Sequence, residues 1–340
     1  DVVRTLMQTE KNLGEVQERA VTTEDLQLVT GTRPTKEQIT AIAANLKEQV
    51  GQMVADNPEL DPNIGKRAAD TPDEVLESRV AEAANQRFRV NIPYYHGTAT
   101  DPLVDGGKGI RRFQGKLGMG VVAGHFTENP KFASDFAPQL MTYQPEYPVV
   151  YPVFLRYGED NEAGGLFEVR SAIQNEGNPV SQSINRTLNN QPELKSNLES
   201  YFASELEKGR ELGPDKTKLR GFEQDDIARF YYEGAMSLRE ASERLAEDFH
   251  NRVAPQAYGM IVEDPYGVDF TQLEPLAPYM KEAGFVGYYD IERPGDPYSA
   301  VAMFNSEDIK GMFARFDPES VPEGRRYEDD IMYSRSSARS

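Results

Sequence analysis

The chain has 340 residues, of which 38% are hydrophobic and 27% are charged, and its net charge is −19. It contains no cysteine, which excludes disulfide bonds, thiolate zinc sites and a cysteine nucleophile, and its acidity argues against broad, sequence-independent binding of nucleic acid. No run of about 18 apolar residues occurs, so we expect no transmembrane helix.

Residues 1–88 are predicted to form a helical N-terminal region. The chain begins with Asp rather than Met, so we expect it to be part of a longer polypeptide. One helix is expected to begin after Thr35, with Gln38 completing a capping-box pattern three residues later. A second is expected to begin after Thr71 as its cap and to run to about Arg87.

Short β segments are predicted over 89–165, the first half of a β domain. The strongest strand pattern covers 147–157, where prolines favour an edge position or a bulge. Glycine-rich loops precede it. A phosphate-binding loop is an alternative for these glycines, although 115–120 matches neither the P-loop spacing nor a dinucleotide-binding fingerprint.

Residues 166–255 return to helical patterns and are predicted to be an insertion between the two halves of the β domain. Helices are expected over 194–211, 222–232 and 237–252. The second half of the domain is predicted over 256–334. Its strands are expected at 258–262 and 301–304, followed by a polar tail.

Two of the three histidines fall in short motifs, Tyr-His-Gly-Thr at 95–98 and Gly-His-Phe-Thr at 124–127. Both patterns are typical of strand ends. A histidine followed by glycine offers a side-chain donor beside an exposed backbone amide, a pair that suits a ribose hydroxyl and a planar carboxamide. The alternative for each histidine is a half-buried strand residue with a satisfied ring.

These motifs, their order and the helix predicted after Asn129-Pro130 resemble the ADP-ribosyltransferase superfamily. The form they resemble is the toxin-like domain of large multidomain (polyvalent) proteins of phages and mobile elements. The closing segment, with Tyr-Ser at 333–334, is similar to the tail of such phage proteins. The resemblance covers about 89–163 and 258–334. It implies an α+β fold with a split β-sandwich of ADP-ribosyltransferase type, a helical N-terminal region and a helical insertion.

The resemblance also implies that NAD binds as a substrate, with no metal. The binding positions would be His96, Gly97, Thr98, His125, Phe126 and Phe136. Among them, Phe136 would stack on nicotinamide, with core packing as its alternative. We expect His96, His125 and Phe136 to line one cleft. A metal site built from both histidines and a carboxylate is a further alternative, but the spacing typical of such motifs is absent.

Members of this family usually carry a glutamate near the start of the last strand, where it bonds the ribose and activates the acceptor. The corresponding stretch here, 296–302, contains no glutamate. Glu292 is therefore the candidate catalytic acid, with a solvated carboxylate paired to Arg293 as its alternative. Asp290 and Glu307 are the next candidates.

Two functions fit these patterns. The first is an NAD-binding ADP-ribosyltransferase-like domain, the C-terminal module of a large phage virion or ejected protein. It would pass from the virion interior into the bacterial host cytoplasm and modify a host protein or nucleic acid. The second is a catalytically inactive module of the same fold, used in virion assembly or genome ejection, or an auxiliary domain of a virion-packaged polymerase. Other virion proteins or upstream domains of the same polypeptide would be its partners.

Overall fold

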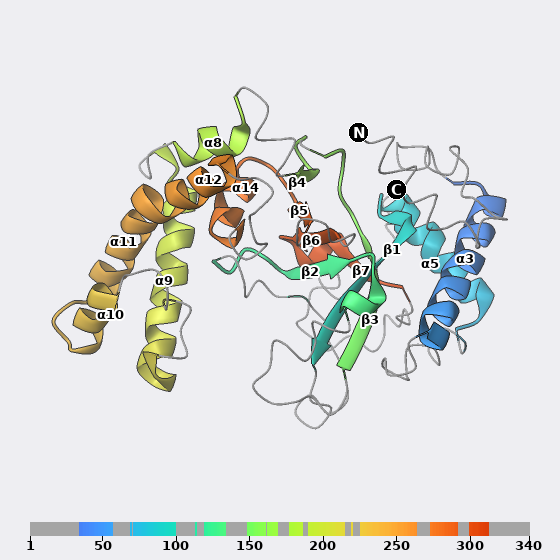
Figure 1. The fold of residues 1–340 in the computed structure, drawn as a ribbon, viewed down its shortest axis with the longest axis horizontal. Helices are drawn as coiled ribbons and strands as arrows, with labels where there is room; N and C mark the ends of the chain where they lie inside the picture. The colour runs from blue at the N-terminus through green and yellow to red at the C-terminus, as the bar shows by residue number, and fades with distance from the viewer. Residues whose placement is uncertain are drawn as a thin grey trace, which may run out of the picture.

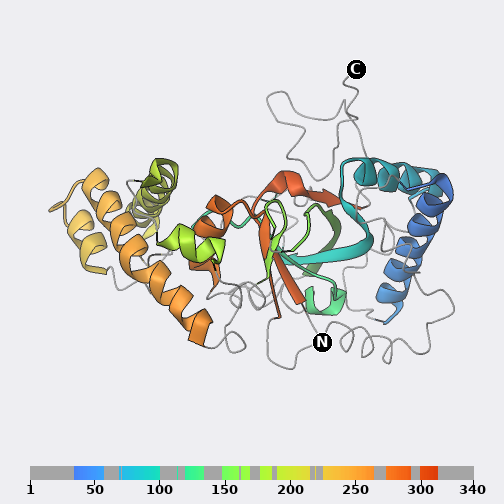
Figure 2. The ribbon, with the colours of Figure 1, turned by 90° about the horizontal axis from the view of Figure 1, so that it is seen from above.

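The structure is a computed structural model. It describes residues 34–56, 69, 71–99, 113, 119–133, 148–160, 162–168, 177–185, 190–214, 219, 225–263, 273–291 and 299–312. Within these residues a β-sheet lies between two groups of helices, α3 and α5 on one side and α8 to α14 on the other (Figure 1). The view from above shows the same arrangement (Figure 2).

The described helices vary widely in length. They are α3 (Lys36–Asp56), α5 (Asp73–Asn85), α8 (Pro179–Ile184), α9 (Pro192–Leu212), α10 (Asp225–Tyr232), α11 (Leu238–Asp248), α12 (Ala254–Glu263) and α14 (Ala277–Glu282). A π-helical segment, η4 (Phe249–Val253), joins α11 to α12, and short 3₁₀ turns precede α14 and the last strand.

The described strands form one hydrogen-bonded sheet. They are β1 (Arg89–Ala99), β2 (Gly124–Thr127), β3 (Pro148–Leu155), β4 (Leu166–Glu168), β5 (Gly287–Ile291), β6 (Ser299–Met303) and β7 (Ile309–Gly311). Their order is β4-β5-β6-β2-β1-β3-β7, and every neighbouring pair is antiparallel except β4–β5. A mixed sheet with separate groups of helices agrees with the predicted α+β class, and the split β-sandwich of ADP-ribosyltransferase type stays a prediction.

Side chains alternate between the two faces of this sheet. We call them the Tyr94 face and the Tyr95 face, after two neighbouring residues of β1. The Tyr94 face carries one apolar cluster, formed by Tyr94, Phe113, Phe126, Val153, Leu155, Leu166, Val301, Met303 and Ile309. The described helices pack on the Tyr95 face instead. There α3 contacts Tyr95, and the helices of the second group contact Ala300 and Ala302 of β6.

Helices α3 and α5 lie where the sequence predicted helices, and residues 1–33 of the predicted helical region lie outside the described residues. In α3 the Thr35 amide donates to Gln38 Oε1 at 2.8 Å and the Gln38 amide donates to Thr35 Oγ1 at 3.3 Å, so the capping box is confirmed. The predicted Thr71 cap of α5 is wrong, because Pro72 occupies the N-cap. The Thr71 carbonyl instead accepts a hydrogen bond from Lys47 Nζ, which also pairs with Asp73 and so ties α5 to α3.

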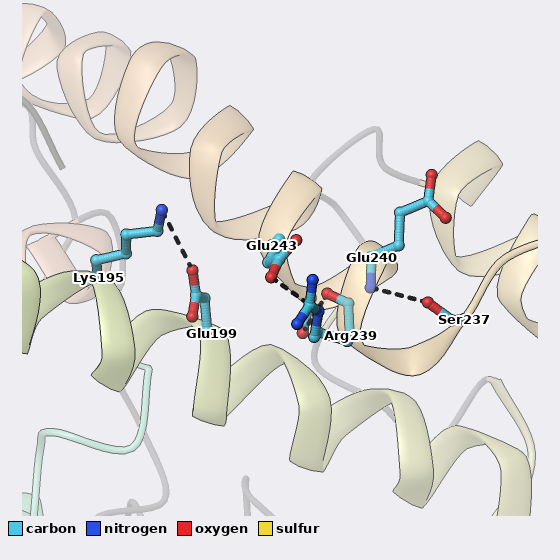
Figure 3. Close-up of polar contacts among 7 residues, drawn as sticks. Lys195, Glu199, Ser237, Arg239, Glu240 and Glu243 are labelled. Carbon is cyan, nitrogen blue, oxygen red and sulfur yellow. Dashed lines mark hydrogen bonds and ion pairs between the residues drawn. The ribbon is translucent and has the colours of Figure 1, made fainter. Parts of the chain in front are cut away.

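The helices between β4 and β5 share a core that includes Phe202 of α9 and Leu245 of α11. All three helices predicted in this stretch are present, as α9, α10 and α11. Two i,i+4 ion pairs lie within single helices, with Lys195 Nζ 3.7 Å from Glu199 in α9 and Arg239 Nε 3.3 Å from Glu243 in α11 (Figure 3). Partly exposed pairs of this spacing contribute little to stability. The buried apolar side chains therefore hold the two helices together.

The strand predicted at 258–262 is wrong, because these residues belong to helix α12. Ile261 and Val262 are β-branched and suggested a strand. In the helix, however, Ala254 and Ile261 lie two turns apart on one buried face, while Val262 is 48% exposed. The helical stretch therefore continues past residue 255 to Glu263.

Replacement of Leu245 by Ala tests this core. Leu245 is fully buried between α9 and α11, so we expect Leu245→Ala to lower the free energy of unfolding by about 2–5 kcal/mol. Leu212→Ala is the matched control, since this leucine is 64% exposed and should change stability by less than about 0.5 kcal/mol. Urea unfolding followed by circular dichroism measures both. Equal losses in the two variants would contradict the packing described here.

Candidate functional site

The two histidine motifs lie side by side on neighbouring strands. β1 and β2 pair antiparallel with Tyr95 opposite Thr127, which places His96 opposite Phe126. The rings of His96 and Phe126 are 5.5 Å apart between centroids, and His96 Nδ1 lies 2.8 Å from the His125 carbonyl oxygen. The motifs, 29 residues apart in the chain, thus meet through one ring contact and one hydrogen bond.

The environment of His96 favours the neutral form of its ring. The half-buried ring of His96 meets the Phe113 ring edge-on, with 4.8 Å between the ring centroids. Tyr151 of β3 is the cross-strand neighbour of His96. Burial lowers the pKa of His96, and the hydrogen bond to His125 only partly opposes this shift. Because a carbonyl can only accept, Nδ1 carries the proton of the neutral ring. Nε2 is therefore an acceptor, suited to a hydroxyl donor.

The side chain of His125 lies on the other face of the sheet. His125 precedes Phe126, which belongs to the Tyr94 face, and it pairs with Ala302, which packs against the helices on the Tyr95 face. The two imidazoles therefore lie on opposite faces, and the expectation that both line one cleft is not met. In the described structure, His125 reaches His96 through its backbone carbonyl.

Gly97 has a packing role. A Cβ atom built at this position would lie 1.5 Å from the backbone oxygen of Ala133, so only glycine lets the helical turn at 130–133 approach β1 this closely. Asn129 starts that turn, since its Oδ1 accepts from the Phe132 amide at 3.0 Å. Gly97 is buried, in contrast to the exposed amide expected from the sequence.

The remaining predicted site residues are placed only in part. Phe126 is buried on the Tyr94 face beside His96. Thr98 continues β1 opposite Val149, and its side chain lies outside the described residues. Phe136 and Glu292 also lie outside the described residues, so their roles stay predictions.

A polar group that the sequence reasoning missed adjoins His96 on the Tyr94 face. The hydroxyls of Tyr94 and Tyr157 are 2.5 Å apart, and the Glu128 carboxyl lies close enough to Tyr94 for each group to shift the pKa of the other. The guanidinium of Arg89 lies over the Tyr157 ring, 3.8 Å from its centroid, and donates to the Gly158 carbonyl at 2.8 Å. The sequence did contain a signal for this group. Side chains two residues apart in a strand share a face, and Tyr94 lies two residues before His96 while Glu128 lies two after Phe126.

Burial perturbs the acids and phenols of this group. It raises the pKa of Tyr94 well above its usual value, and Tyr157 and Glu128 raise it further. It also raises the pKa of the Glu128 carboxyl, a shift that the nearby Tyr94 hydroxyl partly offsets. The pKa of Asp160 is raised by burial as well, with Arg89 opposing the shift. Such perturbed groups are typical of functional sites, although structural networks produce them too.

Among the described residues, no cluster of three or more His, Asp or Glu side chains could hold a metal ion. None of the described helices is long and apolar enough to cross a membrane. The chain matches no protein-family model, no curated protein and no solved structure. The resemblance to ADP-ribosyltransferases therefore depends on the sequence motifs alone.

The packing role of Gly97 can be tested by adding one methyl group. We expect Gly97→Ala to destabilise the fold by about 3 kcal/mol or more, because the new Cβ meets backbone rather than a movable side chain. Gly259→Ala in α12 is the control, since a Cβ there meets nothing within 4 Å and alanine should stabilise the helix by about 0.5–1 kcal/mol. Thermal unfolding of both variants decides. A Gly97→Ala variant as stable as the native chain would refute this contact.

The protonation state of His96 is accessible to NMR, because the chain has only three histidines. We expect its pKa to lie below the ordinary 6.5, with the proton of the neutral ring on Nδ1. Since the folded-state pKa is lowered, its contribution to stability is present above pH 6.5 and lost as the pH falls through the folded value. Long-range ¹H–¹⁵N spectra recorded from pH 8 to pH 5 measure both properties. A pKa above 6.5 or an Nε2–H tautomer would contradict this assignment.

Proposed function

We propose that the chain is an NAD-binding ADP-ribosyltransferase-like domain, whose dinucleotide site lies around His96 on the Tyr94 face. The observation that carries the proposal is the contact between the two motifs, through the hydrogen bond from His96 Nδ1 to the His125 carbonyl. The resemblance rests on two short motifs distant in the chain, and their meeting on adjacent strands is what a shared site requires. The α+β architecture is compatible with this family.

The chemistry of the proposed site follows from the transition state. Cleavage of the bond between ribose and nicotinamide leaves positive charge on the ribose, so the site must orient the hydroxyls, hold the departing ring and offset that charge. The acceptor Nε2 of His96 suits a ribose hydroxyl, and the half-buried ring of Tyr151 suits a flat group of the dinucleotide. NAD would be consumed as a substrate, and no metal is needed.

In this proposal the chain is the C-terminal module of a large phage virion or ejected protein, and it modifies a host target in the bacterial cytoplasm. The second candidate is an inactive module of the same fold used in virion assembly or genome ejection. Two observations favour that candidate. The stretch 296–302 lacks the family's glutamate, and Gly97 is buried against Ala133 rather than open to a ligand.

Binding of NAD distinguishes the two candidates. A ligand that binds only the folded state stabilises it by about 2.7 kcal/mol at a hundredfold excess over its dissociation constant. We expect millimolar NAD to raise the melting temperature of the native chain. His96→Asn should remove most of this shift, because the amide can replace the Nδ1 donor to His125 but provides no group at Nε2.

His125→Asn is the matched control, since its ring lies on the opposite face and its carbonyl is retained. We expect this variant to keep the NAD-dependent shift, and both variants to melt near the native chain without ligand. A native melting temperature that NAD does not change would reject the NAD site and favour the structural module. Equal loss in both variants would place the site elsewhere than the Tyr94 face.

A further inference from the structure

The register of three strands gives Glu128 a particular position. Because Tyr95 pairs with Thr127, Glu128 follows β2 directly opposite Tyr94. Because Thr127 also pairs with Ala300, Glu128 on its other side adjoins Ser299, the first residue of β6. The start of β6 is where the resemblance expects a glutamate and the sequence has none. The register therefore places Glu128 next to this position, on the neighbouring strand.

Glu128 and His96 share the Tyr94 face. They are diagonal neighbours on adjacent antiparallel strands, a relation that puts two residues about 7–8 Å apart, close enough for both side chains to contact the two riboses of one dinucleotide. Phe126 of β2 lies directly opposite His96, and its buried ring is an apolar contact beside the imidazole. His96, a neutral hydrogen-bond acceptor, and Glu128, an acid, therefore lie near each other on the Tyr94 face.

The carboxylate of Glu128 lies beside a fixed phenol. The buried Tyr94 ring is held by the bond to Tyr157, and its hydroxyl is near enough to affect the pKa of Glu128. Glu128 is nevertheless exposed as a residue, whereas burial raises the pKa of its carboxyl. Because Glu128 is exposed, a ligand can approach its carboxylate while Tyr94 stays beside it.

We propose that Glu128, rather than Glu292, is the catalytic acid–base of this domain. This inference rests on the proposed function. The proposed reaction needs no oxidant or reductant. The bond from ribose C1′ to the nicotinamide nitrogen breaks and both electrons leave with neutral nicotinamide. Charge on the ribose is offset by the Glu128 carboxylate, an oxygen of water or of the acceptor bonds to C1′, and its proton passes to that carboxylate.

The other ionisable groups near Glu128 are less suited to act as the catalytic acid–base. Arg89 is engaged with Tyr157 and the Gly158 carbonyl, and Asp160 is the acid next to Arg89. Tyr94 and Tyr157 stay neutral, because burial raises both of their pKa values. A raised pKa also makes the Glu128 carboxylate a better proton acceptor than an ordinary surface glutamate.

The test measures nicotinamide release and NAD binding on the same proteins. Glu128→Gln is isosteric and removes only the charge, so we expect an unchanged melting temperature and unchanged NAD-dependent shift, with release lowered on the order of 100-fold or more. Glu263→Gln, an exposed change on α12, is the control and should match the native chain. Glu292→Gln is assayed in parallel.

The outcomes separate this inference from the proposed function. Native release that is lost in Glu128→Gln with binding intact supports the assignment. Full release by Glu128→Gln overturns it, and the proposed function then survives with Glu292 as the acid if Glu292→Gln is inactive. Native binding of NAD without any release overturns the catalytic role of Glu128 and leaves a binding module. Absence of NAD binding by the native chain rejects the proposed function itself.

Discussion

The antiparallel pairing of β1 with β2 is the constraint on which the rest of the described structure depends. It unites β3 and β7 on one side with β6, β5 and β4 on the other, through the pairing of Tyr95 with Thr127. The hydrogen bond from His96 to the His125 carbonyl extends this short ladder by a side chain. A slip of one residue here would turn every side chain of β2 to the opposite face. The register therefore decides which groups share a face.

The two faces differ in what they offer. Helices of both groups bury their apolar sides on the Tyr95 face, and Gly97 lets the turn at 130–133 approach the same face closely. The Tyr94 face combines an apolar cluster with half-buried polar side chains, including His96, Tyr151 and Tyr157. Half-buried surfaces of this mixed kind suit a ligand with both flat rings and hydroxyls. The helices thus stabilise one face, and the chemistry gathers on the other.

Local signals in the sequence predicted local structure well. The capping box at Thr35 and the apolar stripes of α9 and α11 predict helices, because caps and helical periodicity depend on neighbouring residues. The stretch from Tyr258 to Val262 misled, since its β-branched residues fit a strand as well as the buried face of α12. A short apolar run does not distinguish the two structures.

The sequence motifs predicted that the two histidine segments of the candidate site come together, but not which face of the sheet each side chain lies on. The adjacency of the two histidine motifs could be expected from a resemblance, but the faces of His96 and His125 follow from strand register, which no local pattern specifies. Glu128 was missed for the same reason. Its neighbours Tyr94 and Ser299 are 34 and 171 positions away in the chain, so only the folded sheet brings them together.

The central claim is that a dinucleotide binds on the Tyr94 face between His96 and Glu128. A crystal structure of the chain soaked with a non-hydrolysable NAD analogue tests it most directly. The account predicts a ribose hydroxyl within hydrogen-bond distance of His96 Nε2, with the second ribose beside the Glu128 carboxylate. An analogue bound on the Tyr95 face beside the His125 ring, or no bound analogue at saturating concentration, would contradict it.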